Sequence, residues 1–447
     1  MTDVLTINDP RDGSPVGELE CATDHDVAAV VDRARKTARE WARTDPAERG
    51  ALLAAAAARV RAHADGLTEL TSREMGKPED DARGGVEAGI GTLEQYAQLG
   101  PVHRGQSLLG GWGATDLMVP EPRGVVAAIT PWNDPVAVPC GILGAALVTG
   151  NTVVFKPSER TPHTGLELAR LLQDELPDGV LQVVVGDGRT GEQLAGADVD
   201  VVAHVGSTRA GRSIALATAR TGAKAILENG GNDPLIVDAG VDSRWAAGQA
   251  ATGSFANAGQ ICTSVERIYV VAELAEEFLQ ALVERAGEQE IGPLVDERMR
   301  REVHQQVEDA LDLGAQLLAG GTVPDGPGSH YPCTVLSGCD SRMRIMSEET
   351  FGPTAPVQVV GSFGEALEHA ASGDYGLAAT VLTGSMAHAQ QAWRELPVGT
   401  VKVNAVFGGA PGGAAQPRGL SGQGFGYGPE LLDEMTTTKV VHLGLPG

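Results

Sequence analysis

Short runs rich in β-branched residues alternate with helical segments from residue 124 onward, and this alternation restricts the possible folds most strongly. The runs GVVAAIT, TVVFK, LQVVV and DVVAHV are each followed by a segment with helical spacing. Strand and helix in such alternation indicate a parallel, doubly wound α/β sheet with right-handed crossovers. Because these sheets bind ligands beyond the carboxyl ends of their strands, we expect a ligand cleft along that edge.

A second series of the same kind starts after Asn232. It contains PLIV, a helical segment from Asp242 to Ala258, RIYVV, helices to Gln289 and further alternating segments to Phe407. The repetition predicts a second α/β domain. The Gly-rich tail ends in TTTKVVHL, an amphipathic strand that needs a partner edge.

Helices are expected before the first series. Residues 24–74 carry apolar residues at helical spacing, and Thr23 with Asp26 is typical of a capping box. The run from Ala51 to Val60 is almost entirely Ala, Leu and Val, which predicts a helix lying in a groove and not on the surface. Residues 100–122 are Gly-rich and weakly patterned, as in a loop or an exposed hairpin.

The charge of the chain limits its partners. Its 447 residues include 59 acidic and 34 basic side chains, a net charge of −25, without a basic stripe. We therefore expect no binding to nucleic acid or to anionic membranes. The first residues contain no apolar stretch, and the longest apolar run, 136–150, is short and contains Pro139, so neither export nor membrane insertion is expected.

The number and spacing of the cysteines restrict the class of protein further. The chain has five cysteines, at positions 21, 140, 262, 333 and 339, and none forms a CxxC pair. They are too few and too scattered for a disulfide framework. This predicts a cytoplasmic chain in which at most one cysteine has a chemical function. No group of His, Cys and Asp has the spacing of metal ligands, so no metal is expected.

Three residues are candidates for chemistry. Cys262 lies in GQICTS, on a Gly-turned loop between a helix and a strand, where local amides could stabilise a thiolate; an inert buried thiol is the alternative. Glu228 ends the strand AKAILE and precedes two glycines that permit close backbone approach; a solvated strand-end carboxylate is the alternative. Asn133 lies between two prolines in TPWNDP and could donate to an oxyanion, or could form an Asx turn.

Two Gly-rich turns are candidates for phosphate binding. Gly186, Gly188 and Gly191 form GxGxxG after LQVVV, but no acidic residue closes the next strand as a dinucleotide fingerprint requires, so we expect an ordinary turn there. The next junction, GSTRAG, is the better candidate, because Gly206 permits the turn and Ser207 caps a helix whose amides face an anion. A plain helix cap remains the alternative.

Together these passages resemble the aldehyde dehydrogenase superfamily along nearly the whole chain. The matching motifs occur in the family's order: TPWND, VVFKPSERTP, GSTRAG, LENGGNDP, GQICTS, EETFGP, YGLAATVLT, VKVN and SGQGFG, with a terminal KVV. The spacings from Asn133 to Lys156 and from Glu228 to Cys262 are also similar to the family's. The resemblance implies a non-acylating, NAD(P)-dependent aldehyde dehydrogenase.

The resemblance also implies roles for single residues. Cys262 would attack the aldehyde carbon, and Asn133 with the Cys262 backbone N–H would hold the oxyanion. Glu228 would activate the water that hydrolyses the thioester to an acid. The implied cofactor-binding residues are Thr130, Trp132, Lys156, Ser158, Glu159, Gly206, Ser207, Gly211, Glu349 and Phe351.

The expected cofactor is NAD. The family resemblance places Lys156 and Glu159 at the adenosine ribose, and a carboxylate at 159 repels a 2′-phosphate, although the nearby lysine leaves NADP possible. The resemblance further implies an NAD-binding domain at 1–103 and 123–230 and a catalytic domain at 231–420. Residues 104–122 and 421–447 would form an oligomerisation element of a homodimer or homotetramer.

Several departures from the family pattern concern the substrate. Asp134 and Ala256 stand where aromatic residues are common, and with Ile261 and Phe407 they are expected to line the substrate channel. Asp134 could attract an amino group or hydroxyls, or could belong to a salt bridge or a solvated loop. A betaine-type cage is not expected, because the chain has only 7 Phe, 5 Trp and 5 Tyr.

Three further departures bear on activity itself. His204 and Val205 replace the usual Phe and Thr before GST, and Asn229 replaces Leu in LENGG. These changes remove no catalytic group. We therefore predict oxidation of a small polar, amino or hydroxy aldehyde. A CoA-acylating or reductive enzyme and a silent NAD-binding scaffold are the alternatives.

Overall fold

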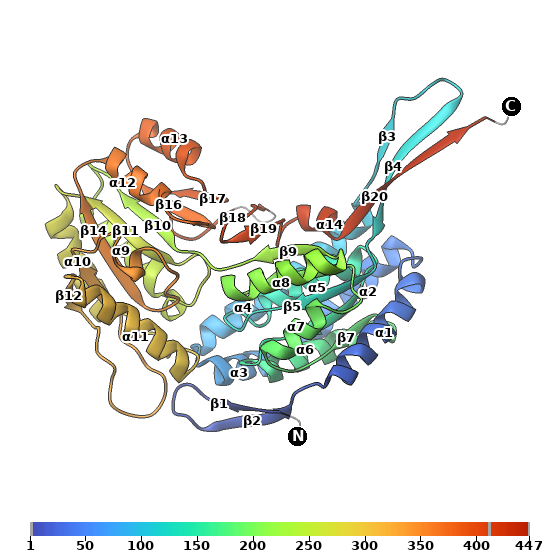
Figure 1. Ribbon diagram of the computed structural model, residues 1–447, viewed down its shortest axis with the longest axis horizontal. Helices are drawn as coiled ribbons and strands as arrows, with labels where there is room; N and C mark the ends of the chain where they lie inside the picture. Colours follow the sequence, from blue (N-terminus) through green and yellow to red (C-terminus); the bar gives the residue numbers. More distant parts are fainter. Residues whose placement is uncertain (1–2, 410–412, 446–447) are drawn as a thin grey trace.

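The computed structural model describes residues 3–409 and 413–445; parts of the expected 231–420 and 421–447 segments thus lie outside the described residues. One half contains a six-stranded sheet of order β19-β9-β8-β5-β6-β7, seen on the right of Figure 1. Its strands are β5 (Val125–Ile129), β6 (Thr152–Lys156), β7 (Leu181–Val183), β8 (Val201–Val205), β9 (Lys224–Glu228) and β19 (Gly422–Gln423). All are parallel except β19, which confirms the doubly wound sheet expected from the alternation.

Strand order in this sheet reverses between β5 and β8. Strands β6 and β7 lie on one side of β5, whereas β8 and β9 lie on the other. The connecting helices are α5 (Ala137–Val148), α6 (Pro162–Gln173), α7 (Gly188–Ala195) and α8 (Thr208–Thr221). In doubly wound sheets the crevice at such a reversal is the usual ligand site.

The N-terminal segment covers this sheet. It comprises β1 (Val4–Asn8), β2 (Pro15–Glu20), α1 (Asp24–Trp41), α2 (Pro46–Ala62), α3 (Ala64–Met75) and α4 (Glu79–Leu99). The helices expected over 24–74 are therefore present. Helices α1, α7 and α8 cover one face of the sheet, and α2, α4, α5 and α6 cover the other.

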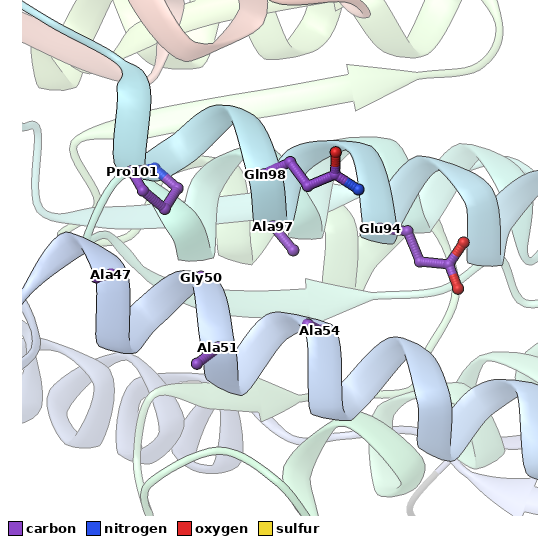
Figure 2. Close-up of a pocket in the computed structure, with 8 residues that line it drawn as sticks. All are labelled: Ala47, Gly50, Ala51, Ala54, Glu94, Ala97, Gln98 and Pro101. Atoms are coloured by element: carbon purple, nitrogen blue, oxygen red, sulfur yellow. The ribbon is translucent and has the colours of Figure 1, made fainter.

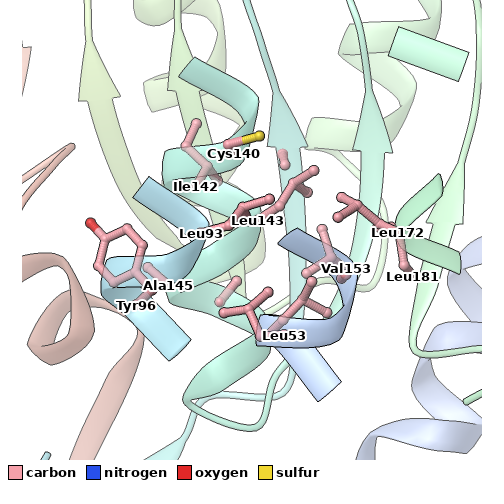
Figure 3. Packing of buried hydrophobic residues seen from close by; sticks show 14 of the residues in the cluster. Leu53, Leu93, Tyr96, Cys140, Ile142, Leu143, Ala145, Val153, Leu172 and Leu181 are labelled. Carbon is pink, nitrogen blue, oxygen red and sulfur yellow. The ribbon is translucent and has the colours of Figure 1, made fainter. Parts of the chain in front are cut away.

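The core on the second face consists mainly of Leu, Val and Ala. Leu53 on α2, Leu93 on α4 and Leu143 on α5 are fully buried against Val153 on β6 (Figure 3). Small and branched side chains fill this volume because the chain has few aromatic residues. Strands buried on both faces, as β5 and β6 are, explain the continuous apolar runs in the sequence.

The expectation that the Ala-rich helix lies in a groove is wrong. Helix α2 buries Leu53, Ala57 and Val60 but leaves Ala51 and Ala54 exposed. These exposed alanines lie in a shallow groove beside α4, where Figure 2 shows Glu94 and Gln98. Ala contributes so little apolar surface that exposing it costs little, so a run of Ala does not define the buried face.

The capping box at the start of α1 is confirmed. The Thr23 hydroxyl accepts a hydrogen bond from the Asp26 backbone N–H at 3.2 Å, and the Asp26 carboxylate accepts from the Thr23 N–H at 2.8 Å. Replacing Thr23 by Ala is expected to lower the free energy of unfolding by about 1 kcal/mol, measured by urea denaturation. Thr37→Ala, at a half-buried position inside the same helix, is the control and should cost less.

The second half contains a seven-stranded sheet of order β12-β13-β14-β11-β10-β16-β17, on the left of Figure 1. Its strands are β10 (Asp233–Val237), β11 (Val265–Val271), β12 (Gln316–Ala319), β13 (Thr334–Ser337), β14 (Thr354–Val360), β16 (Ala378–Leu382) and β17 (Thr400–Val403). Its helices are α9 (Ser243–Phe255), α10 (Ala275–Glu288), α11 (Glu297–Asp312), α12 (Phe363–Ala371) and α13 (Met386–Glu395). The second α/β series in the sequence thus forms a second sheet.

A three-stranded sheet projects from the rest of the chain at the upper right of Figure 1. It consists of β3 (Gln106–Leu108), β4 (Ala114–Pro122) and β20 (Thr436–Gly444), in the order β20-β4-β3. The 100–122 segment is therefore a hairpin, and the C-terminal strand pairs with β4 of its own chain. Its neighbour α14 (Glu430–Glu434) and strand β19 pack with the first half instead.

Two short strands, β15 (Tyr375–Gly376) and β18 (Arg418–Gly419), pair with each other. Three 3-10 turns, η1 (Gly100–Val102), η2 (Ala256–Gly259) and η3 (Arg344–Met346), complete the structure. Within residues 3–409 and 413–445, no helix combines the length and apolar character that crossing a membrane requires.

Candidate active site

A large cleft lies at the carboxyl ends of the parallel strands of the first sheet. Its volume is about 1480 Å³, above the roughly 300–1,000 Å³ typical of pockets for one drug-sized ligand. The residues that follow β5, β6, β8 and β9 form one wall, and residues of α11 and of the segment 348–351 form the other. The cleft is thus in the place that the strand order predicts.

Most of the predicted site residues line this cleft. They are Thr130, Trp132, Asn133, Lys156, Ser158, Glu159, Gly206, Ser207, Glu228, Cys262, Glu349 and Phe351. The predicted residues outside its lining are Gly211, Asp134, Ala256, Ile261 and Phe407. Gly211 lies in α8 on its buried side, where a side chain would overlap the Asn229 amide, so the structure gives it a packing position.

Cys262 reaches the cleft through an unusual turn. The helix expected to run to Ala258 ends at Phe255, because Asn257 and Ala258 have left-handed backbone angles, with φ of 50° and 55°. Gly259 follows at φ 72°, where a side chain would overlap the backbone of Gly352. Left-handed angles at non-glycine residues cost of order 1–3 kcal/mol each and concentrate at functional sites.

The Gln260 side chain fixes this turn. Its Oε1 accepts a hydrogen bond from the Val295 N–H at 2.9 Å, and its Nε2 donates to the Asn257 carbonyl at 3.0 Å. Its own carbonyl accepts from the Asn133 Nδ2 at 3.0 Å, which joins the loop of the predicted oxyanion residue to the loop of the thiol. Because an amide NH2 has two N–H donors, one of those of Asn133 stays available.

The Cys262 thiol is protonated in the free protein. Burial, together with the charges of Glu228, Asp233 and Glu349, raises its pKa to about 12, although the Lys402 ammonium opposes this shift. A thiol with such a pKa needs a neighbouring base to remove its proton before it can act as a nucleophile. Glu228 is the neighbouring carboxylate that also lines the cleft.

Glu228 is held at the end of β9. Burial raises its pKa to about 6, and a hydrogen bond from the Gly426 N–H at 3.2 Å opposes this shift. A side chain at Gly426 would overlap the Glu228 carboxylate, so this glycine provides the space that the carboxylate occupies. A carboxyl group with a pKa near 6 is ionised at neutral pH yet basic enough to accept a proton.

Glu349 lies over the turn after Glu228. Its Oε1 accepts a hydrogen bond from the Gly231 N–H at 3.2 Å, and a side chain at Gly230 would overlap its carboxylate. Burial and the nearby Glu266 raise the pKa of Glu349 well above its usual range. The two glycines therefore permit the close approach that the sequence indicated.

Glu266 is a buried residue that the sequence analysis missed. Its carboxylate accepts hydrogen bonds from the backbone N–H groups of Thr350 and Phe351, at 2.9 and 2.8 Å, and from the Asn232 amide at 3.1 Å. It thereby fixes Phe351, whose ring contacts Trp132 edge-on at 5.5 Å between centroids. The only sequence signal was the pair of charged residues Glu266 and Arg267 in a strand that is otherwise apolar apart from Tyr269.

The other end of the cleft carries polar groups after β6 and β8. The Lys156 Nζ donates to the Pro157 carbonyl at 2.9 Å and lies 3.9 Å from the Glu159 carboxylate. Ser207 is the N-cap of α8, since its hydroxyl accepts from the Ala210 N–H at 3.3 Å. Gly206, Ser207 and Ala210 line the cleft, so the start of α8 borders it, as an anion site at a helix N-terminus requires.

Several buried polar atoms in this cleft have no hydrogen-bond partner within residues 3–409 and 413–445. They are Thr130 Oγ1, Arg160 Nη2, Asn229 Oδ1 and both ring nitrogens of His204. Buried polar groups are nearly always paired, so unpaired ones at the crevice between β5 and β8 fit a polar ligand such as a dinucleotide.

Helix α7 is a wall of the cleft that the sequence analysis discounted. Its first residues, Gly188 and Arg189, and its Gly191 line the cleft opposite α8. Asp187 caps this helix by accepting from the Arg189 N–H at 2.9 Å. The GxGxxG pattern does form a turn, but the turn opens a helix that borders the ligand site.

Asp134 lies next to the cleft, between α4 and the start of α5. A Cβ at Gly85 on α4 would be 2.7 Å from its Oδ1. No ion pair or side-chain hydrogen bond involves this carboxylate among the residues that the structure describes. The salt bridge considered as one alternative is therefore not present there.

Comparison with known proteins agrees with this arrangement. The sequence model of the aldehyde dehydrogenase family matches residues 2–441. The chain belongs to the aldehyde dehydrogenase family. It is 36% identical over 408 residues to an alpha-ketoglutarate semialdehyde dehydrogenase from Haloferax volcanii, covering 87% of this chain and 84% of that protein. It is 36% identical over 470 residues to a 3,6-anhydro-alpha-L-galactose dehydrogenase from Streptomyces coelicolor, covering 98% and 93%.

Solved aldehyde dehydrogenases have the same fold. A betaine aldehyde dehydrogenase from Staphylococcus aureus in complex with NAD+ superposes with a TM-score of 0.95 at 28% identity, covering 99% of this chain and 92% of that one. The family resemblance and the α/β fold predicted from the sequence are thus confirmed. As a member of the aldehyde dehydrogenase family, the chain is an enzyme that oxidises aldehydes.

Proposed function

We propose that this aldehyde dehydrogenase oxidises a small polar aldehyde, with an amino or hydroxyl group, to a free carboxylic acid. The observation that carries the proposal is the convergence of Cys262, Asn133 and Glu228 on one cleft. The proposed coenzyme is NAD, with NADP as the possible second, because the unpaired polar atoms at the crevice fit a dinucleotide and the S. aureus relative holds NAD+. When bound, the nicotinamide accepts a hydride.

The residues of this chain then perform three tasks. Glu228 takes the proton of the Cys262 thiol, and the thiolate adds to the aldehyde carbon. The Asn133 Nδ2 and the Cys262 backbone N–H stabilise the resulting oxyanion. Glu228 then releases that proton to solvent water and is ionised again. After oxidation to the thioester, it removes a proton from a water molecule whose oxygen attacks the thioester carbon; the C–S bond breaks, the acid is released, and the Cys262 thiolate takes the proton back from Glu228.

Coenzyme binding would use both walls of the cleft. Lys156, Ser158 and Glu159 would meet the adenosine ribose, with Thr130 and Trp132 beside them toward the reacting end. Gly206 and Ser207 would meet the pyrophosphate at the start of α8. On the opposite wall, Glu349 would bind the nicotinamide ribose next to Phe351. The exposed position of the Glu159 carboxylate supports NAD over NADP, because it opposes a 2′-phosphate.

Residues 1–103 and 123–230 form the proposed NAD-binding domain and 231–420 the proposed catalytic domain. The oligomerisation element is proposed at 104–122 and 421–447. The first segment supplies β3 and β4 of the projecting sheet, whereas β20 is the strand that the described part of the second segment adds to it. This sheet carries exposed Trp112 and Val440, and no described strand pairs with the outer edge of β20. An exposed apolar edge of this kind supports a homodimer or homotetramer.

Two alternatives remain to be separated from this proposal. A CoA-acylating enzyme would transfer the acyl group to a thiol and would not need Glu228, which is buried in the cleft here. A silent scaffold would bind NAD without turnover. NADH formation with a panel of aldehydes, with and without coenzyme A, distinguishes all three: dependence on coenzyme A or the absence of turnover would contradict the proposal.

The Asp134 carboxylate is the proposed basis of substrate choice. Replacing it by Asn is expected to lower the ratio of kcat/KM for an amino aldehyde to that for an alkyl aldehyde of equal length by about tenfold, the effect of one charged hydrogen bond. Asp178→Asn, far from the cleft and paired with Arg33, is the matched control for the loss of one charge. An unchanged ratio in Asp134→Asn would remove Asp134 from substrate recognition.

A further inference from the structure

His204 occupies the crevice where the strand order of the first sheet reverses. It pairs with Ile129 across β8 and β5, the two strands between which the order changes. The residue is 5% exposed and lines the cleft. Doubly wound sheets usually bind their ligands in the crevice where the strand order reverses.

The His204 ring has no hydrogen-bond partner in the part of the chain that the structure describes. Both Nδ1 and Nε2 are buried and unpaired. Burial lowers its pKa to about 4, although the backbone groups of Ser207 and Ile129 close to the ring oppose this shift, so the imidazole is neutral and carries one N–H donor. A buried unpaired donor is costly, and its presence at a ligand site calls for a partner that arrives with the ligand.

The ring lies beside the start of α8. A Cβ at Gly206 would be 2.7 Å from its Cε1 and 3.0 Å from its Nε2, so the imidazole packs directly against the turn between β8 and the helix. Helix α8 follows with Ser207 as its N-cap, and the start of the helix borders the cleft. An anion at the amides of its first turn would therefore be close to the ring.

We propose that the His204 imidazole is a binding residue for the coenzyme, donating its N–H to a pyrophosphate oxygen held at the start of α8. This inference rests on the proposed use of NAD or NADP. It assigns a function to the departure at this position, because a phenylalanine there could fill the same space but could not donate a hydrogen bond. His204 would thus add affinity at the phosphates without contacting the reacting atoms.

Binding of NAD+, ADP and adenosine to the purified enzyme tests the inference by isothermal titration calorimetry. His204→Phe, which keeps a ring but removes both nitrogens, is expected to weaken NAD+ and ADP about tenfold and to leave adenosine unchanged. His204→Gln, which restores a donor, is expected to bind ADP with an intermediate affinity. His103→Phe, at a histidine paired with Asp433 outside the cleft, is the matched control.

The outcomes separate this inference from the proposed function. If the native enzyme binds neither NAD+ nor NADP+, the proposed coenzyme is wrong. If the native enzyme binds NAD+ and His204→Phe binds ADP equally well, only the role of His204 is wrong. If His204→Phe fails to fold, the native enzyme and His204→Gln are compared by the increase in melting temperature that ADP causes. An equal increase in both would contradict the role of His204.

Discussion

Replacement of Cys262 by Ala is expected to reduce aldehyde oxidation by roughly 10⁴-fold or more, because no other group in the cleft can form the covalent intermediate. Among the five cysteines, Cys262 is the one that lines the cleft, whereas the other four are buried elsewhere. Coenzyme binding should stay intact, since the proposed coenzyme contacts come from other residues. NADH formation and the Kd for NAD+ measure the two effects separately.

The matched control is Cys21→Ala, which removes a buried thiol outside the cleft. It should retain nearly full turnover. The raised pKa of Cys262 adds a second readout: iodoacetamide should alkylate this thiol slowly at pH 7 and faster as the pH rises. Full turnover by Cys262→Ala, or rapid alkylation at pH 7 in the absence of coenzyme, would contradict the assigned chemistry.

The strands of the first sheet could be predicted from sequence for a physical reason. Strands such as β5 and β6 are buried on both faces, so their residues form continuous β-branched runs bounded by Gly and Asn. The helix at Ala51 to Val60 was placed wrongly, because Ala is tolerated on either face of a helix. Propensity alone does not show which face packs.

The end of α9 at Phe255 could not be predicted. Left-handed angles at Asn257 and Ala258 depend on contacts far away in sequence, such as that between Gly259 and Gly352. The same holds for Gln260, whose partners lie near residue 295. Tertiary contacts determine these backbone angles and the hydrogen bonds of Gln260, and the local sequence pattern does not reveal them.

The candidate site, like the fold, could be predicted from the sequence only in part. Cys262, Glu228 and Asn133 were recognisable by their loop context and by resemblance to the family, and the structure places them on one cleft. The turn at Gly188 was discounted because it lacks the expected acidic residue, yet its helix borders the cleft. The expected acidic residue is one way in which a protein binds a ribose, so its absence does not exclude a ligand beside this helix. Whether the helix borders the crevice depends on the arrangement of the whole sheet.

Replacement of Glu228 by Gln is expected to slow release of the acid by about 10²–10⁴-fold, the usual effect of losing a general base. The first oxidation should slow less, because thiolate formed by loss of the Cys262 proton to solvent water can still add to the aldehyde. Rapid-mixing experiments should therefore show a burst of NADH followed by slow turnover. Glu302→Gln removes a half-exposed carboxylate from the opposite wall of the same cleft and serves as the control. It should show neither the burst nor the loss.

The pH dependence of the native enzyme gives the second part of this prediction. Only the ionised carboxylate of Glu228 can accept a proton from water, and burial raises its pKa to about 6. Steady-state turnover should therefore rise tenfold per pH unit below about pH 6 and level off above it, whereas the slow turnover of Glu228→Gln should lack this step. If Glu228→Gln keeps the same step near pH 6, another group supplies the base, and Glu228 only shapes the cleft.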